Sequence, residues 1–516
     1  MSIFGTYCNS SQNFVSDYLN ESSVRFVRKI YLIKKNTHSH ITMDIKLKAV
    51  FSFSSVKYMC LIGAVISYVF FGLSLTDWLY NEQGWSLEDA FEHYGVILTV
   101  ILYMLTAGIY ISVPFSALNL VGLLLFNPFC RKHNDAVIST ETPFICFRVV
   151  TRGTFPVLVQ DVTSKNLEIC MRWGLKNFKF EIVSDNVIDL PSSHYVREVV
   201  VPRDYKTTNG TLFKARALHY SLDHSVNILS LDDWIVHLDE ETLLTEDVLH
   251  GIVDFVNKPN SSIGQGVITY GGGTIENWIT TLMDGVRTAI DYGLFRLALQ
   301  LFHRPVFGIK GSFLVVKMRV ESDIGFDFGP TESIAEDLRF ALTAWNKGYL
   351  FDFVNGVMQE KSTFTLADFV KQRKRWLIGH FHVIWNDTLP LYCKLGVLPL
   401  HLGNLMLWMN VLSSISSFVL PVPQSKWQVT LFLLLTLNFN LIIMFGNYMS
   451  LSFRPRHFIA KFIICFLAQF LLPVLGILES YAALLGFYHR NTLKFDIVQK
   501  EIGTRQVKVI RDSSNV

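Results

Sequence analysis

Three acidic residues, Asp239, Glu240 and Glu241, follow directly on an apolar segment at residues 234–238. In an α/β sheet, a buried strand that ends in carboxylates presents oxygen ligands to a divalent cation at the carboxyl edge of the sheet. On a continued strand, Asp239 and Glu241 would share one face and Glu240 would point to the other. The same acids would also suit the solvated first turn of a helix, where negative charge is favourable. The segment by itself leaves both interpretations open.

A second acidic pair, Glu336 and Asp337, begins an apolar helical pattern that continues to Trp345. Carboxylates at a helix N-terminus commonly serve only to stabilise the helix. The functional alternative is a general base, which requires a carboxylate within hydrogen-bond reach of an attacking hydroxyl group.

Gln372, Arg375 and Trp376 occupy positions i, i+3 and i+4 of a predicted helix and therefore share one face. A Trp ring beside an Arg and a Gln suits stacking on a sugar and pairing with a phosphate. The alternative is a basic amphipathic helix that lies on anionic lipid. That alternative draws on three further basic residues of the same helix: Lys371, Arg373 and Lys374.

These residues require a scaffold, and residues 146–357 alternate between strand-like and helix-like segments. Strands are predicted at residues 146–153, 180–185 and 195–202, and helices at residues 161–178 (with Asp161 or Thr163 as N-cap) and 214–222. Such alternation predicts a doubly wound, mostly parallel α/β sheet. Ligands of these sheets bind at the carboxyl ends of strands, where Asp185 and Asp239 both fall.

The composition places this scaffold in a membrane protein. Of 516 residues, 50% are hydrophobic and 17% are charged, which is too apolar for an ordinary soluble enzyme and too charged for a pure bundle of membrane spans. The net charge of +3 gives no argument for nucleic acid. The seven cysteines have no metal-ligand spacing, so we expect neither a zinc site nor a disulfide framework. Reduced thiols would place the globular part in a reducing compartment.

Apolar segments define the rest of the organisation. They predict two transmembrane segments within residues 58–126, a cytosolic catalytic domain at 143–390, about three spans within 395–488, a polar and basic N-terminal extension at 1–57 and a tail at 489–516. Residues 458–488 fit one tilted span or a re-entrant pair, which leaves the side of the tail open. No secretory signal is expected before Met43.

The charges of the loops predict the orientation. Residues 76–94 contain five acids and no Lys or Arg, whereas the outer flanks carry basic residues: Lys46, Lys48, Lys57, Arg131 and Lys132. Because basic loops remain in the cytosol, the catalytic domain should face the cytosol and the acidic loop the opposite side.

Taken in order, an aspartate that ends the second strand, a DxD-like cluster, an ED pair at a helix start and QxxRW before the membrane form a specific series. This series resembles the family-two inverting glycosyltransferases of the GT-A fold, which include the cellulose, chitin and hyaluronan synthases and glucosylceramide synthase. The resemblance covers about residues 143–382 and the spans that follow. It implies a GT-A catalytic domain inserted between N-terminal and C-terminal transmembrane helices.

Three segments, VPRDYKTTNGTLFKARALHY, DDWIVHLDEET and QRKRWLIGHFHVIWND, are similar to the Egghead-type β-1,4-mannosyltransferases of invertebrate glycosphingolipid synthesis. That resemblance implies transfer of mannose from GDP-mannose to the lipid glucosylceramide, in the endoplasmic reticulum or Golgi membrane. Sequence spacing alone does not choose between guanine and uracil in the donor.

The resemblance also implies roles for individual residues. Asp185 and Lys214 would contact the nucleotide, Asp239 with Glu241 would hold Mn²⁺ or Mg²⁺ on the diphosphate, Asp337 would be the base, and Gln372, Arg375 and Trp376 would lie beside the diphosphate and the acceptor. The metal motif reads DEE here rather than DxD, so Asp239 is the better supported ligand.

Other functions fit the sequence less well. A processive polysaccharide synthase of the same fold also needs a polymer channel, for which about three C-terminal spans are few. The segments quoted above favour the mannosyltransferases over glucosylceramide synthase. A transporter or scaffold would place charged residues within its spans, where Glu479 is the chief exception in this chain.

Overall fold

The structure is a computed structural model that describes residues 53–82, 84–130, 142–191, 193–258, 261–386, 388–451, 458–492 and 498–500. The chain divides into two units, Met1–Leu61 and Ile62–Val516, and the second contains the features discussed below. Most of the predicted N-terminal extension, most of the tail and the basic flanks at Lys46, Lys48, Arg131 and Lys132 lie outside the described residues.

A seven-stranded sheet forms the centre of the second unit. Its strands are β1 (Ile145–Thr151), β2 (Phe178–Ser184), β3 (Val196–Val200), β4 (Trp234–Leu238), β5 (Ile263–Thr269), β6 (Leu314–Lys317) and β7 (Phe351–Gln359). Their order is β3-β2-β1-β4-β6-β5-β7. Only β6 is antiparallel to its neighbours, β4 and β5, which confirms the predicted mostly parallel α/β sheet.

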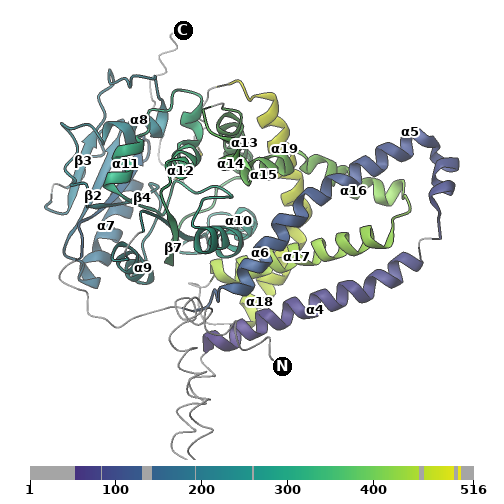
Figure 1. Ribbon diagram of the computed structural model, residues 1–516. Helices are drawn as coiled ribbons and strands as arrows, with labels where there is room; N and C mark the ends of the chain where they lie inside the picture. The colour runs from purple at the N-terminus through teal and green to yellow at the C-terminus, as the bar shows by residue number, and fades with distance from the viewer. Residues whose placement is uncertain are drawn as a thin grey trace, which may run out of the picture. The chain divides into compact units, whose positions relative to one another are not determined.

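Helices cover both faces of this sheet (Figure 1). The helices α7 (Pro156–Trp173) and α9 (Glu246–Val256) pack on one face, where Phe147, Phe180 and Trp234 belong to the buried core. On the other face, α8 (Phe213–Tyr220) contacts β1 and β2, and α11 (Met318–Ile324) contacts β6.

The first crossover helix differs from the prediction at both ends. It was expected at residues 161–178, but α7 begins at Pro156 and ends at Trp173. Proline is favourable in the first turn of a helix because its missing N–H would have no intrahelical partner there. Gly174 then ends the helix in the left-handed conformation, at φ 85°, and Phe178 already begins β2.

Further helices follow the sheet strands in the second half of the chain. They are α10 (Trp278–Ile290), the π-helices η2 (Asp291–Phe295) and η3 (Ala298–Phe302), the 3₁₀ helix η4 (Glu332–Ala335), α12 (Glu336–Asn346), α13 (Leu366–Ile384) and α14 (Leu391–Lys394). The cysteines within the described residues are free, as expected: Cys60, Cys130, Cys146, Cys170, Cys393 and Cys465.

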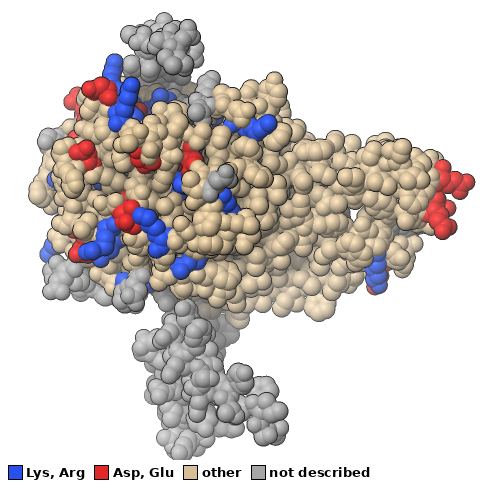
Figure 2. All heavy atoms as spheres, turned by 45° about the horizontal axis from the view of Figure 1, so that its top comes forward, with Lys and Arg blue, Asp and Glu red and all other residues tan. Residues whose placement is uncertain are grey.

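The apolar helices are α4 (Phe53–Asn81), α5 (Leu87–Ala107) with η1 (Gly108–Ser112) and α6 (Val113–Leu125), α15 (Val397–Leu405), α16 (Leu407–Val419), α17 (Lys426–Ser450), and α18 (Phe458–Leu467) with η6 (Ala468–Leu471) and α19 (Leu472–Tyr488). Within the described residues, four helical segments are long and apolar enough to cross a membrane, or five if the bent pair α15–α16 is counted. Figure 2 shows many charged residues on the surface of the sheet region and few on the surface of the apolar helices.

Two sets of contacts mark the ends of these helices. At the end away from the sheet, the Tyr94 hydroxyl donates to the carbonyl of Pro421 at 3.2 Å. At the sheet end, Ser450 Oγ accepts from the backbone N–H of Tyr270 at 2.8 Å, and Asn119 Oδ1 accepts from that of Leu294 at 2.9 Å. Helix α17 therefore runs from the turn at residues 421–425 to the edge of the sheet.

Candidate active site

The acidic cluster lies in a turn directly after β4. This strand ends at Leu238, and the backbone N–H of Thr242 donates to the carbonyl of Asp239 at 3.0 Å. The expectation that Glu240 points away from Glu241 is wrong, because Lys500 forms ion pairs with both carboxylates. The alternation of a strand does not extend into a turn, so the rule that predicted opposite faces does not apply here.

Lys214 connects this turn with the acidic pair at the start of α12. Its Nζ lies 2.7 Å from Asp239 Oδ1 and 3.9 Å from Glu336 Oε1. Gly311 lies between Lys214 and Asp337, since a Cβ added to this glycine would meet Asp337 Oδ2 at 3.2 Å and Lys214 Nζ at 3.4 Å. The structure thus brings together four of these side chains, from α8, the β4 turn and α12.

The acids of this cluster have strongly shifted pKa values. Burial opposes ionisation of Asp239, but Lys214 and Lys500 outweigh burial and lower the pKa of Asp239 to about 2. Burial raises the pKa of Glu241 to about 7; Lys500 opposes this shift, and Asp239 adds to it. Burial and the adjacent Asp337 likewise raise the pKa of Glu336 to about 7. Negative charge is therefore incompletely balanced at this edge of the sheet.

A hard divalent cation fits this excess of carboxylate charge. Mg²⁺ in particular is commonly held by one or two carboxylates and by the phosphates of a substrate. Asp239 is the more accessible ligand because its side chain is 37% exposed, and Glu241 lies in the same turn. Within the described residues, no group of three or more His, Cys, Asp or Glu side chains is arranged to hold a metal ion. A cation here would accordingly depend on substrate oxygens for its remaining ligands.

Asp185 and Arg375 connect two further elements with the cluster. Asp185 follows β2 and accepts from Arg216 Nη2 at 2.5 Å. Since Arg216 and Lys214 both belong to α8, this short helix contacts the carboxyl ends of β2 and β4. Arg375 lies in α13, and burial lowers its pKa, whereas Glu336 and Asp239 oppose that shift. Its guanidinium group thus belongs to the electrostatic environment of the acidic cluster.

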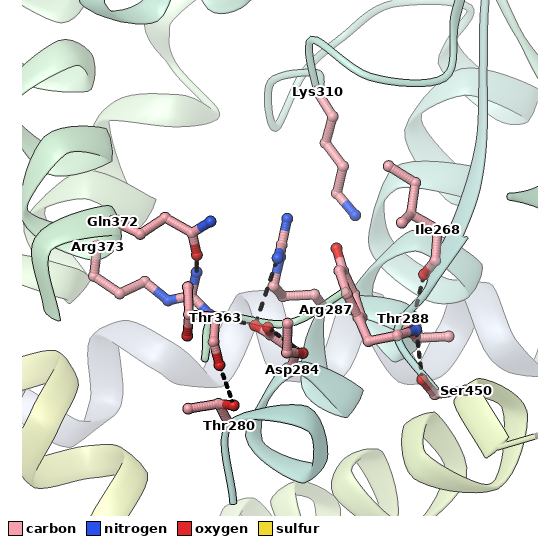
Figure 3. Close-up of polar contacts among 12 residues, drawn as sticks. Ile268, Thr280, Asp284, Arg287, Thr288, Lys310, Thr363, Gln372, Arg373 and Ser450 are labelled. Carbon is pink, nitrogen blue, oxygen red and sulfur yellow. Dashed lines mark hydrogen bonds and ion pairs between the residues drawn. The ribbon is translucent and has the colours of Figure 1, made fainter. Parts of the chain in front are cut away.

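Trp376 contacts two guanidinium groups. The guanidinium carbon of Arg373 is 4.4 Å from the centre of the indole ring, and that of Arg287 is 4.6 Å from it. Asp284 of α10 links both arginines, at 2.6 Å from Arg373 Nη2 and 3.5 Å from Arg287 Nη1 (Figure 3). Such contacts fix the plane of the ring before any ligand arrives.

Three comparisons with known proteins bear on this site. Residues 234–476, which contain the β4 turn, Asp337 and α13, match the family described as glycosyl transferase family group 2. The β-1,4-mannosyltransferase bre-3 of Caenorhabditis elegans is 42% identical over 424 residues, which are 81% of this chain and 92% of that protein. The chain belongs to glycosyl transferase family group 2.

A second relative of this glycosyltransferase is the β-1,4-mannosyltransferase egh of Drosophila melanogaster, 39% identical over 82% of this chain and 92% of that protein. Among solved structures, S. aureus TarS 1–349 aligns with 63% of this chain and 89% of its own, at 12% identity and a TM-score of 0.29. That similarity is too low to carry any argument.

Arg373 of the glycosyltransferase is not part of a basic surface that faces lipid. The residue is 8% exposed, and its guanidinium group also donates to Glu479 Oε1 at 2.7 Å and to Gln372 Oε1 at 3.0 Å. Lys371 is half-exposed and pairs with Asp368 of the same helix. The basic residues of α13 therefore have separate roles, and Arg373 joins this helix to α10 and α19.

Several residues of this environment were not predicted from the sequence. Glu360 follows β7 and accepts from Thr242 Oγ1 at 2.8 Å. Its place directly after the partly apolar segment at residues 351–359 was an available signal. No local signal identifies Lys500, which lies 259 residues from its partner Glu241. The partnership of Asp284, Arg287 and Glu479 with α13 likewise depends on contacts between distant segments.

Trp376→Ala should lower kcat/KM by about tenfold or more, because the substitution removes an aromatic stacking surface that two guanidinium groups hold in a fixed position. Lys374→Ala, in the same helix, should change kcat/KM little. Both variants are compared in a transfer assay at equal detergent and lipid content. Equal losses would favour a lipid-surface role for the whole helix.

Proposed function

We propose that the chain is a membrane-bound β-1,4-mannosyltransferase that transfers mannose from GDP-mannose to glucosylceramide with inversion. The observation that carries this proposal is the meeting of Asp239, Lys214 and Asp337 at the carboxyl edge of the sheet, where ligands of such sheets bind. Donor and acceptor come from the resemblance to the β-1,4-mannosyltransferases, with which bre-3 and egh agree by name.

In this proposal Asp337 is the general base. Its Oδ1 accepts from the backbone N–H of Leu338 at 2.8 Å, while Oδ2 faces Gly311. The acceptor hydroxyl attacks the anomeric carbon from the side of Asp337, which takes the hydroxyl proton as the new bond forms. Because Gly311 has no side chain, the sugar can approach both Asp337 and Lys214.

The departing diphosphate gains negative charge in the same step. Lys214 and Arg375 lie on the leaving-group side and stabilise this charge. A bound Mn²⁺ or Mg²⁺, held by Asp239 with Glu241, would supply Lewis-acid stabilisation of the diphosphate. Asp185 contacts the nucleoside, and Gln372 and Trp376 line the acceptor side.

The proposed orientation places the sheet in the cytosol, with α4, α5–α6, α15–α16 and α17 crossing the membrane. Helices α18 and α19 would instead lie along the cytosolic surface of the membrane. Lys461 lies over the ring of Tyr448 at 4.0 Å, Glu479 pairs with Arg373, and both partners are at the sheet end of the helices. The direction of α18–α19 across that of α17 supports this arrangement (Figure 1).

All three N-x-Ser/Thr sequons of the catalytic domain should remain unglycosylated, because oligosaccharyl transfer occurs on the lumenal side. Asn209 already donates from Nδ2 to the carbonyl of Asp327 at 2.9 Å, and Asn386 donates to Glu332. The third sequon, at Asn260, lies outside the described residues. Expression in animal cells followed by glycosidase treatment should give no gel shift. A shift mapped to any of the three sites would place this domain in the lumen and contradict a cytosolic reaction.

The proposal is tested by supplying purified protein in lipid with GDP-mannose, UDP-glucose or UDP-N-acetylglucosamine, with and without glucosylceramide. Nucleotide release should require GDP-mannose and should rise with the acceptor lipid. EDTA should abolish release, and Mn²⁺ or Mg²⁺ should restore it. Equal release from the UDP-sugars would overturn the proposed donor.

A further inference from the structure

The C-terminal segment of the chain reaches the acidic turn after β4. Lys500 Nζ lies 3.0 Å from Glu240 Oε1 and also pairs with Glu241. The segment is anchored by Val498, which is 7% exposed. The three acids of this turn thus have two lysine partners from distant parts of the chain, Lys214 on Asp239 and Lys500 on the two glutamates.

The position of Lys500 has an electrostatic consequence. Glu240 and Glu241 are partly buried, so their carboxylates have lost part of their hydration, and the ammonium group of Lys500 supplies an opposite charge to this turn. A divalent cation that used Glu241 as a ligand would share this carboxylate with Lys500, which pairs with Oε2, and would repel the ammonium group. Each of the two cations, the lysine ammonium group and the metal ion, therefore weakens the binding of the other to the Glu241 carboxylate.

The ammonium group has an alternative partner close by when a donor is bound. A nucleoside diphosphate adds two or more negative charges beside the metal ion, and a lysine pairs with phosphate as a point charge. Lys500 is 22% exposed at its side chain, so it has access to the space beside the turn. Its long, flexible side chain permits this change of partner without movement of the sheet.

We propose that Lys500 neutralises Glu240 and Glu241 in the nucleotide-free enzyme. When metal and donor bind, its ammonium group leaves the two carboxylates and pairs with the diphosphate. Lys500 would then be a donor-binding residue supplied by the C-terminal segment. This inference rests on the proposed function, because it takes Asp239 and Glu241 as the metal ligands. It also requires residue 500 to be on the same side of the membrane as the sheet.

The test uses the full chain in lipid and two binding measurements rather than activity. Mn²⁺ binding to the nucleotide-free protein is followed by the electron paramagnetic resonance signal of free Mn²⁺, and GDP binding at saturating Mn²⁺ is followed by calorimetry. Lys500→Gln should bind Mn²⁺ about tenfold more tightly and GDP about tenfold more weakly, which is the scale of one partly screened charge pair. Lys500→Arg should retain most of the GDP affinity.

Two controls separate this inference from the proposed function. Lys165→Gln removes an exposed lysine that pairs with Asp161 in α7, and it should change neither affinity. Asp239→Asn should abolish Mn²⁺ binding. If Asp239→Asn behaves so but Lys500→Gln matches the wild type, or loses both affinities, the role of Lys500 is overturned and the metal site stands. If the wild type binds no Mn²⁺ with or without GDP, the metal site fails and the role of Lys500 fails with it.

Discussion

Asp337→Asn should lower the turnover of mannose transfer by about 10²–10⁴-fold, the usual contribution of a positioned general base. GDP affinity should remain nearly unchanged, because the base acts on the acceptor hydroxyl in the transition state and not on the nucleotide. Asn has almost the same shape as Asp, so the hydrogen bond from the Leu338 N–H to Oδ1 can be kept. Turnover and GDP affinity are measured on the same preparation.

The neighbouring Glu336 provides the comparison for this result. It is 7% exposed, and burial with the charge of Asp337 raises its pKa to about 7, which is also a favourable range for a base. Asp337 is less buried and faces Gly311, where a sugar can approach. Glu336→Gln should therefore lose much less turnover than Asp337→Asn. A larger loss in Glu336→Gln would assign the base to Glu336, and a collapse of GDP affinity in Asp337→Asn would make Asp337 part of the donor site.

Asp239→Ala should remove the dependence of activity on Mn²⁺ and weaken donor binding by about 100-fold or more, since both depend on the same carboxylate. Its loss also leaves Lys214 without the acceptor 2.7 Å away, so that the lysine turns toward Glu336. Donor affinity is measured as a function of Mn²⁺ concentration, and the titration should be flat in the variant.

Asp233 offers a matched control because it precedes the same strand that Asp239 follows. Its carboxylate accepts from the backbone N–H of Ser230 at 2.7 Å, at the opposite end of β4. Asp233→Ala should retain the Mn²⁺ titration of the wild type. A normal titration in Asp239→Ala would remove this residue from the metal site.

The sequence predicted those parts of the fold and the candidate site that depend on local patterns. Strand–helix alternation predicted the sheet, and the position of Asp185 and Asp239 directly after apolar strands predicted the edge at which they lie. Local spacing suffices for these two residues because the carboxyl ends of neighbouring parallel strands meet at one edge. Asp337 was noted at the start of a predicted helix, but its role as the base came from the resemblance to the family-two glycosyltransferases.

Features that depend on distant contacts could not be predicted in this way. The short strand β6 lies between β4 and β5 and is antiparallel to both. Its direction depends on these two distant strands and not on its own residues. Arg373 and Glu479 are 106 residues apart, so nothing near either residue reveals their ion pair. The alternation rule failed at Glu240 because the strand ends one residue before the acids, a boundary that composition does not define.

The most direct test of the central claim is the structure of the reaction product. Purified protein, GDP-mannose, Mn²⁺ and glucosylceramide are incubated in lipid, and the glycolipid product is analysed by mass spectrometry and NMR. The account predicts one added hexose, a mannose in β-configuration on O4 of the glucose, because a single in-line attack inverts the α-linked donor. An α-linked mannose, a different sugar, or release of free mannose with no glycolipid product would contradict it.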